Sequence, residues 1–276
     1  MNPLKTVALV VNRSKTGARE IGEQLEKLGK AQGAEMRITE EHPLPSGFLK
    51  GCDAVCVIGG DGTFLGVVPQ AAAYGVKILG VNLGKLGFLV TFSPDGIAQE
   101  FGQILSGKYE TEQRNLLEAS SDRGERRLCL NDIVIKQTHS SRLMMLEVFA
   151  NSEFVNEFAC DGLIFSTPTG STAYNLSAGG PILHPSVQGI TLTPICPHTL
   201  SNRSVILSHD TKIEIKTDLE NCRPNVTLDG HQSFDHEEEF PLKIRVPSQT
   251  VTLIHGEEYS HFQTVRTKLQ WRETSL

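Results

Sequence analysis

The first third of the chain alternates short apolar runs with stretches in which apolar residues recur at helical spacing. Thr6–Val11, apolar from Val7 onward, and the apolar run Ala54–Ile58 are predicted to be buried strands by their length and their β-branched residues. Ala18–Gln32 carries apolar residues every three or four positions, which predicts an amphipathic helix. The same reasoning predicts further elements at Glu35–Thr39, Thr63–Tyr74, Ile78–Val81 and Pro94–Leu105. This alternation predicts an α/β domain with a mostly parallel sheet over residues 1–113.

The pattern changes near Arg114, after which short strands dominate and turn signals such as Asp229-Gly230 separate them. Strands are predicted at Leu128–Lys136, Leu143–Ala150, Ile190–Pro194, Lys212–Thr217, Asn225–Leu228, Lys243–Val246 and Val251–His255. We therefore expect an all-β C-terminal domain over residues 114–256. Ser260–Trp271 regains helical spacing, and we expect this C-terminal helix, within residues 257–276, to return to the N-terminal domain.

Composition and charge restrict the kinds of partner. The chain has 39% hydrophobic and 21% charged residues, which is ordinary for a globular protein, and a net charge of −6. Nucleic-acid binders normally carry a basic surface, so we expect no nucleic-acid partner. A substrate rich in phosphate would have to be held by local donors rather than by overall charge.

The cysteines and apolar runs bear on where the protein works. Six cysteines are present, none in a Cys-x-x-Cys pair, and most stand beside apolar residues. We expect buried, reduced thiols, as in cytosolic proteins. No run approaches the length of a membrane span, and the first apolar run is too short for the core of a signal peptide. The sequence predicts a cytoplasmic protein with no membrane partner.

A glycine-rich turn, Gly59-Gly60-Asp61-Gly62-Thr63, follows the second apolar strand directly and precedes a predicted helix. Glycine lets the backbone approach a ligand closely, and free amides at a helix N-terminus bind phosphate oxygens. A Walker A loop needs a Gly-Lys-Ser/Thr sequence that is absent here, and the dinucleotide fingerprint fails because Leu65 stands where its last glycine belongs. Without further signals, a plain strand-to-helix turn remains an equal alternative.

Asp61 is the unexpected residue in this turn, because a carboxylate repels phosphate. Its presence is explained if it takes the proton of an attacking hydroxyl during phosphoryl transfer, or if it binds Mg²⁺ through water. An ordinary turn aspartate is the alternative.

A second, longer signal runs from Asp161 to Gly180, where a short apolar strand enters a hydroxyl-rich turn and then a brief helix closed by Gly179. Seven of the twelve side chains from Ser166 to Ser177 carry a hydroxyl, which exceeds what helix capping needs. Small Ala173 and the ring of Tyr174 suit a flat ligand ring. We therefore predict a binding site here; a well-capped helix with Tyr174 in the core is the alternative.

Together these segments resemble the NAD kinase family. The glycine turn matches its first motif and Asp161–Gly180 its second, and nearly the whole chain matches in the right order. Further matching stretches are Asn82-Leu83-Gly84-x-Leu86-Gly87-Phe88-Leu89, Leu130-Asn131-Asp132, Pro197-His198-Thr199-Leu200-Ser201-x-Arg203 and Lys268-Leu269-Gln270-Trp271. The first motif is shared loosely with lipid kinases and phosphofructokinases, whereas the second is specific.

The resemblance implies phosphorylation of the 2′-hydroxyl of the adenosine ribose of NAD, giving NADP. Asp61 would be the catalytic base and Asn131 and Asp132 would hold ribose hydroxyls. The donor phosphates would bind at Gly59, Gly60, Gly62 and Thr63. The implied NAD-binding residues are Asp61, Gly62, Phe88, Asn131, Asp132, Arg142, Ala159, Asp161, Thr172, Ala173, Tyr174, Asn175, Leu176, Ser177 and His231.

The resemblance also implies ATP as donor, or polyphosphate in its place, with Mg²⁺ bound to the donor rather than to protein ligands. It implies a homo-oligomer, either a dimer or a tetramer. Asp132 stands where the family usually has Glu, so either the backbone or a water must compensate for the shorter side chain. Ala159 stands where some members carry a basic residue, which leaves the preference for NAD or NADH open.

Two other functions stay open on the residues alone. A lipid or sugar kinase could use the glycine turn, but it would give no reason for the hydroxyl-rich segment. A non-catalytic dinucleotide sensor would bind NAD and would be unaffected by loss of Asp61.

Overall fold

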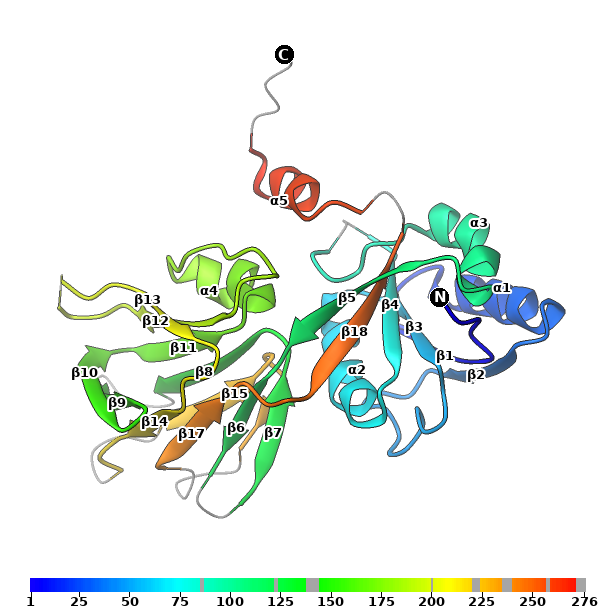
Figure 1. Cartoon of the computed structure of the whole chain (residues 1–276). Coiled ribbons are helices and arrows are strands. Elements are labelled where there is room, and N and C mark those ends of the chain that lie inside the picture. The colour runs from blue at the N-terminus through cyan, green and yellow to red at the C-terminus, as the bar shows by residue number, and fades with distance from the viewer. Residues whose placement is uncertain are drawn as a thin grey trace. The chain divides into compact units, whose positions relative to one another are not determined.

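The computed structural model describes residues 1–84, 87–121, 124–137, 144–199, 201–219, 224–234, 240–256 and 259–271. The chain divides into two compact units (Figure 1), one formed by residues 1–113 with 251–276 and the other by residues 114–250. The predicted α/β domain with a mostly parallel sheet and the predicted β-rich second domain are both confirmed, and the sheets of the second domain are antiparallel.

The first unit is built on a six-stranded sheet of order β2-β1-β3-β4-β18-β5. In this order, every pair of neighbouring strands from β2 as far as β18 is parallel. The strands are β1 (Thr6–Val11), β2 (Glu35–Thr39), β3 (Ala54–Gly59), β4 (Lys77–Asn82), β5 (Glu110–Asn115) and β18 (Thr250–His255). The helices are α1 (Ala18–Ala31), α2 (Asp61–Tyr74), α3 (Pro94–Leu105) and α5 (His261–Leu269).

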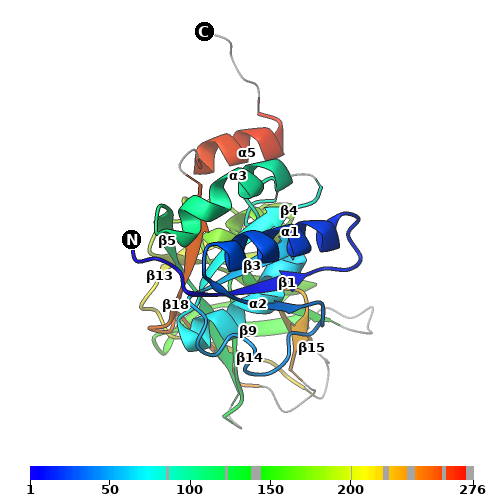
Figure 2. The ribbon, with the colours of Figure 1, turned by 90° about the vertical axis from the view of Figure 1, so that its right-hand side faces the viewer.

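Helices cover both faces of this sheet. Helices α1 and α3 pack side by side on one face and α2 lies on the other (Figure 2). Every residue of β3 is buried, which is why its sequence is continuously apolar rather than alternating. Helix α3 begins with Ser93 as its N-cap, whose hydroxyl accepts the N–H of Gly96, and with Pro94 in the first turn.

The second unit consists of two antiparallel sheets that share one core. One has the order β10-β9-β14-β17-β6-β7, and the other β13-β12-β11-β8-β15-β16. The first sheet contains β6 (Leu117–Ser120), β7 (Arg126–Cys129), β9 (Met144–Ala150), β10 (Glu153–Cys160), β14 (Ile213–Lys216) and β17 (Leu242–Arg245). The second contains β8 (Asp132–Gln137), β11 (Gly162–Ser166), β12 (Gly189–Ile195), β13 (Val205–Ser208), β15 (Pro224–Leu228) and β16 (Gln232–Ser233).

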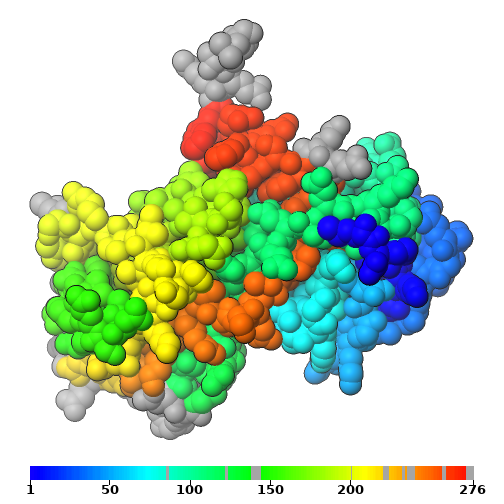
Figure 3. Space-filling model, in the orientation of Figure 1, coloured from blue at the N-terminus to red at the C-terminus, as the bar shows by residue number. Residues whose placement is uncertain are grey.

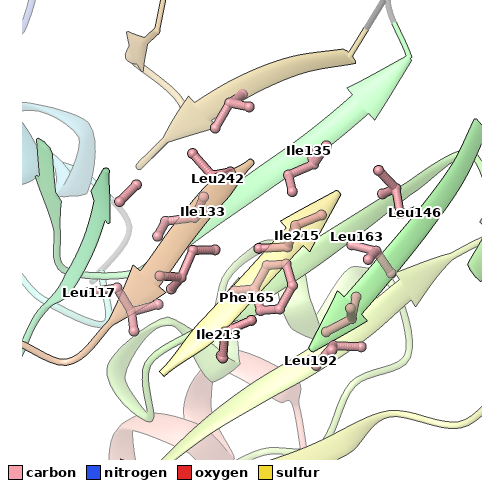
Figure 4. Close-up of a cluster of buried hydrophobic side chains, with 14 of the residues drawn as sticks. Leu117, Ile133, Ile135, Leu146, Leu163, Phe165, Leu192, Ile213, Ile215 and Leu242 are labelled. Atoms are coloured by element: carbon pink, nitrogen blue, oxygen red, sulfur yellow. The ribbon is translucent and has the colours of Figure 1, made fainter. Parts of the chain in front are cut away.

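Alternate residues of these strands form the core between the two sheets (Figure 4). On β8, Ile133 and Ile135 are fully buried in this core, and the neighbouring positions Asp132 and Lys136 lie on the opposite face of the strand. A 3-10 turn, η1 (Thr169–Thr172), and the single-turn helix α4 (Tyr174–Ser177) follow β11.

Three sequence expectations need correction. Val251–His255, expected in the all-β domain, is β18 of the first unit, between β4 and β5. Leu128–Lys136 is not one strand, because the chain breaks at Leu130 and Asn131 between β7 and β8. Strands β5, β6, β10, β13 and β16 were not predicted. The sequence of β5 is mostly polar, β10 mixes polar and apolar residues, and β6, β13 and β16 have only four, four and two residues.

The cysteines follow expectation with one exception. Cys52, Cys56, Cys129 and Cys160 are buried free thiols, whereas Cys196 is exposed. Burial raises the pKa of Cys56 to about 12, which makes that thiol inert. Cys222 lies outside the described residues.

Candidate active site

Asp61 stands at the carboxyl end of β3, where α2 begins. The chain leaves β1 on one side to form β2 and returns on its other side to form β3. In open α/β sheets, ligands bind at the carboxyl ends of strands where the order reverses in this way. Gly60, with extended backbone, precedes Asp61, which starts the helix. The glycine turn therefore lies where this kind of sheet favours a site.

The Asp61 carboxylate is held by the segment that follows β4. Its Oδ2 accepts the N–H of Phe88 at 3.0 Å, and its Oδ1 accepts the N–H of Val90 at 3.3 Å. Each oxygen keeps a lone pair for another donor. The first and third sequence motifs thus meet at one side chain, and that side chain is fixed by backbone rather than by mobile groups.

Gly87 leaves the space that the Asp61 carboxylate occupies. The third motif contains this glycine, but the sequence alone assigns it no role. A Cβ atom placed on Gly87 would overlap both oxygens of the Asp61 carboxylate. No larger residue fits without moving either the carboxylate or the segment that holds it. The sequence signal that could have pointed to this role is its place directly before Phe88 in the third motif.

Asn12, at the end of β1, is a second residue that sequence reasoning missed. Its Nδ2 donates to the hydroxyl oxygen of Thr63 at 2.8 Å, and a Cβ on Gly59 would lie 2.8 Å from that oxygen. Asn12 therefore orients Thr63, and Gly59 leaves room for it. Gly62 is exposed in the first turn of α2.

The Asn131-Asp132 pair lies at the start of β8, and Asp229 shapes the backbone there. The Asp229 carboxylate accepts three successive N–H groups, from Leu130 at 2.8 Å, Asn131 at 2.7 Å and Asp132 at 3.2 Å. These amides are thereby taken out of the strand ladder, which is why the predicted single strand is broken here. The chain crosses from one sheet to the other at this point.

Asp132 is buried, with 5% of its surface exposed, and its carboxyl accepts the backbone N–H of Tyr174. Burial, and then the nearby charge of Asp229, raises the pKa of Asp132 to about 7. Burial also raises the pKa of Asp229. The two carboxyls therefore form a coupled pair in which Asp132 gains or loses its proton near neutral pH.

The raised pKa of Asp132 predicts a pH-dependent stability. Unfolded Asp132 ionises near pH 3.8, whereas in the folded protein it keeps its proton to about 7, so stability falls as the pH rises through this window. Asp132→Asn removes the buried charge but keeps an acceptor for Tyr174. We expect the variant to gain little at about pH 4 and on the order of 2 kcal/mol above the neutral range, measured by urea unfolding. An equal gain at both pH values would contradict this.

Most hydroxyls of the hydroxyl-rich segment donate to backbone carbonyls, some of them in distant parts of the chain, which corrects the argument that its hydroxyls outnumber structural needs. Thr167 Oγ1 donates to the carbonyl of Leu130 at 2.6 Å, and Ser171 Oγ donates to that of Pro168 at 2.6 Å. A Cβ on Gly170 would overlap the backbone of Asn131. These contacts join the second motif to the Asn131-Asp132 pair.

Asn175 is fully buried and its side chain is saturated. Its amide donates to the carbonyls of Ser171 and Pro181, both at 3.0 Å. Its oxygen accepts the hydroxyls of Thr191 and Thr193, at 3.3 and 2.7 Å. A contact between Asn175 and NAD would therefore use its backbone.

Tyr174 is half-buried on the outer face of β8. The Lys136 ammonium lies 4.3 Å from the centre of its ring, a cation–π contact that sequence reasoning did not foresee. Around it, Thr172, Ala173 and Leu176 are half-buried and Ser177 is exposed.

The remaining predicted residues are spread over other elements. Ala159 is half-buried near the end of β10, and Asp161 is exposed between β10 and β11. His231 is exposed in the turn after Asp229. Arg142, and Leu86 of the third motif, lie outside the described residues.

No three His, Cys, Asp or Glu side chains of the described ranges gather into a group that could hold a metal ion. Across the same ranges, no helix is both long and apolar enough to cross a membrane.

Comparison with protein families gives matches over both units. The ATP-NAD kinase N-terminal domain matches residues 7–109, and the ATP-NAD kinase C-terminal domain matches residues 130–256. The NAD kinase of Chromohalobacter salexigens is 37% identical over 98% of both chains. That of Sulfurimonas denitrificans is 35% identical, also over 98% of both. The NAD kinase of Thiobacillus denitrificans is 42% identical over 79% of this chain and 77% of its own.

Two solved structures share the fold. An NAD kinase from Archaeoglobus fulgidus in complex with ATP has a TM-score of 0.79 at 24% identity, covering 97% of this chain and all of its own. Yeast NADH kinase complexed with NADH has a TM-score of 0.81 at 25% identity, covering all of this chain and 90% of its own.

Proposed function

The chain belongs to the ATP-NAD kinase family, and from this premise we propose that it transfers the terminal phosphoryl group of ATP to NAD and forms NADP. The observation that carries this proposal is that both domains of the family match in order and that relatives named NAD kinase align over nearly their whole length. The placement of Asp61 at the carboxyl edge of the parallel sheet supports it.

We infer that Asp61 is the general base. Its carboxylate takes the proton of the 2′-hydroxyl of the adenosine ribose while that oxygen attacks the terminal phosphorus of the donor. The new O–P bond forms as the bond from phosphorus to the leaving phosphate oxygen breaks, and ADP departs. The amides of Phe88 and Val90 keep the carboxylate in one orientation, so a free lone pair can point at the hydroxyl.

The donor phosphates would bind at the N-terminus of α2, where Gly60 and Gly62 place no side chain over the first amides of the helix. Gly59, assigned to the donor by resemblance, is the buried last residue of β3. The Thr63 hydroxyl oxygen already accepts a hydrogen bond from Asn12, so its own O–H is oriented to donate. We propose that Mg²⁺ is carried by the donor phosphates rather than by a set of protein ligands. Bound there, the metal would neutralise charge that develops on the phosphates.

NAD would be held by the second unit. Asn131 and Asp132 would bind ribose hydroxyls, while Tyr174 and its neighbours Thr172, Ala173, Leu176 and Ser177 would frame a base. Ala159, Asp161, His231 and Arg142 would complete the contacts that this unit makes with NAD. Because Asp132 is already anchored by Tyr174 and lies beside Asp229, its shorter side chain is fixed before ligand arrives.

Tyr174→Ala should raise the Michaelis constant for NAD by about 5- to 150-fold, because stacking of a base on an aromatic ring contributes roughly 1–3 kcal/mol. The constant for ATP should change much less. Tyr174→Phe keeps the ring and serves as the matched control, with NAD affinity near that of the native protein. If both constants rise together in Tyr174→Ala, Tyr174 is a packing residue instead.

We also propose that the protein is a cytoplasmic homo-oligomer. Exposed aromatic side chains support self-association: Phe262 on α5 is 56% exposed and Trp271 after it is 50% exposed. The surface of α5, orange to red in Figure 3, is open to view. Light scattering during size-exclusion chromatography measures the number of copies.

The decisive assay couples NADP formation to an NADP-specific dehydrogenase, with NAD or NADH as acceptor and ATP or polyphosphate as donor. The proposal predicts NADP formation with NAD and at least one donor, lost when Mg²⁺ is chelated. Binding of NAD without turnover under any donor would favour a dinucleotide sensor. Phosphorylation of diacylglycerol or a sugar would favour the other kinase classes.

A further inference from the structure

Asp229 is a buried acid that the proposed mechanism does not use. It is 7% exposed, and its two carboxylate oxygens take three consecutive backbone amides at the point where the chain passes from β7 to β8. The contact is reciprocal, since the N–H of Asp229 donates to the carbonyl of Asp132 at 3.0 Å. Four hydrogen bonds therefore join the end of β15 to the start of β8.

A plain turn does not explain this acid. Asp229 has a φ of 51° and is followed by Gly230 at 71°, a conformation that Asn would adopt as easily. Burying a carboxylate is unfavourable unless it is fully hydrogen-bonded, and three amide donors supply those bonds. The three amide donors of Leu130, Asn131 and Asp132 therefore explain why an acid stands at position 229, whereas its own turn does not require one.

We propose that Asp229 is a positioning residue for NAD, whose carboxylate holds the backbone that presents Asn131 and Asp132 to the ribose hydroxyls. This inference rests on the proposed function. Both Asp229 carboxylate oxygens are engaged by backbone amides, so in this proposal Asp229 acts through Asn131 and Asp132 rather than by contact with the substrate. Gly170, packed against the Asn131 backbone, closes the other side of the same turn.

The charge of Asp229 has a second effect on the same site, because it helps to raise the pKa of Asp132. Among the described residues, two other titratable groups interact with this pair. One is the Cys129 thiol, whose pKa burial and the two acids raise well above its usual range, and the other is the His231 imidazole, which lowers the pKa of Asp229. Neither supplies a negative charge at neutral pH. Removing the charge of Asp229 should therefore let Asp132 ionise at lower pH.

The test measures NAD affinity by isothermal titration from about pH 5 to pH 9 for the native protein and for Asp229→Asn. Asn keeps the size of Asp but places an NH₂ group against backbone donors. We expect NAD affinity to fall by about tenfold or more, ATP affinity to stay near native, and the midpoint of the pH profile to move down from near neutrality. Asp210→Asn, which removes an exposed acid of the same unit, should leave affinity and midpoint unchanged.

Asp229→Ser is the alternative variant if Asp229→Asn folds poorly. Serine removes the charge and places no NH₂ group against the backbone N–H donors. An unchanged NAD affinity and midpoint in a folded variant would overturn the proposal. So would equal losses of NAD and ATP affinity with an unmoved midpoint, which would indicate a structural role alone. If the native protein binds NAD but forms no NADP, the proposed kinase function fails while the effect of Asp229 on NAD binding is still measured.

Discussion

Asp61→Asn is expected to lower kcat by a factor of about 10² to 10⁴, because a positioned general base contributes on that scale and an amide cannot accept the proton. NAD affinity should remain near native, since most of the proposed NAD contacts lie on other residues and Asn is nearly the same size as Asp. Steady-state assays of NADP formation give kcat, and titration of NAD gives the affinity.

The side-chain amide of Asp61→Asn can also lower stability, and a control must separate this effect from the loss of the base. Both Asp61 oxygens accept backbone N–H groups, so the NH₂ group of Asn must face either Phe88 or Val90. Thermal unfolding of Asp61→Asn reports the resulting loss of stability independently of activity. Asp95→Asn removes an exposed acid from the first turn of α3 and should retain native kcat. A turnover for Asp61→Asn within about threefold of native would exclude the base assignment and favour a sensor.

Gly87→Ala should reduce kcat by on the order of 10²-fold, although no new polar group is added. The new Cβ would overlap the Asp61 carboxylate, and misplacing a catalytic group by about 1 Å can lower the rate by this factor. Gly84→Ala is the matched control in the same segment, since the nearest atom to its Cβ would be Asn82 Oδ1 at an ordinary 3.8 Å.

The double variant tests whether Gly87 acts through Asp61. If it does, adding Gly87→Ala to Asp61→Asn should produce little further loss, because the base is already absent. Fully multiplicative losses would show that Gly87 matters for another reason. Native turnover in Gly87→Ala would mean that the segment moves aside without affecting the carboxylate.

Local patterns predicted those parts of the fold in which burial is continuous or strictly periodic. The strand β1 and the helix α3 begin and end where the sequence indicated, because an apolar run and a Ser-Pro cap determine them locally. The glycine turn and Asp61 were found for the same reason. The role of Gly87 could not be found, since it depends on a carboxylate that the fold brings to it.

The break between β7 and β8 shows most clearly what local sequence patterns cannot predict. Residues 128–136 look like one strand, and what interrupts them is a carboxylate from Asp229, far along the chain. The hydroxyls of the second motif were likewise interpreted as ligand contacts, because their backbone acceptors, such as the carbonyl of Leu130, are not local. The roles assigned to site residues by family resemblance remain predictions.

The position of β18 has a consequence for how the protein emerges from the ribosome. Residues 114–250 form a continuous unit, whereas the sheet of the first unit takes one inner strand from residues 250–255, between β4 and β5. Until those residues are synthesised, the part of β4 around Ile78 lacks its partner on that edge and β5 has no neighbouring strand in the sheet. An unpaired apolar edge invites association with other chains. The sheet of the first unit therefore stays incomplete until the whole second unit has been translated. We expect chaperones to be needed most during this interval.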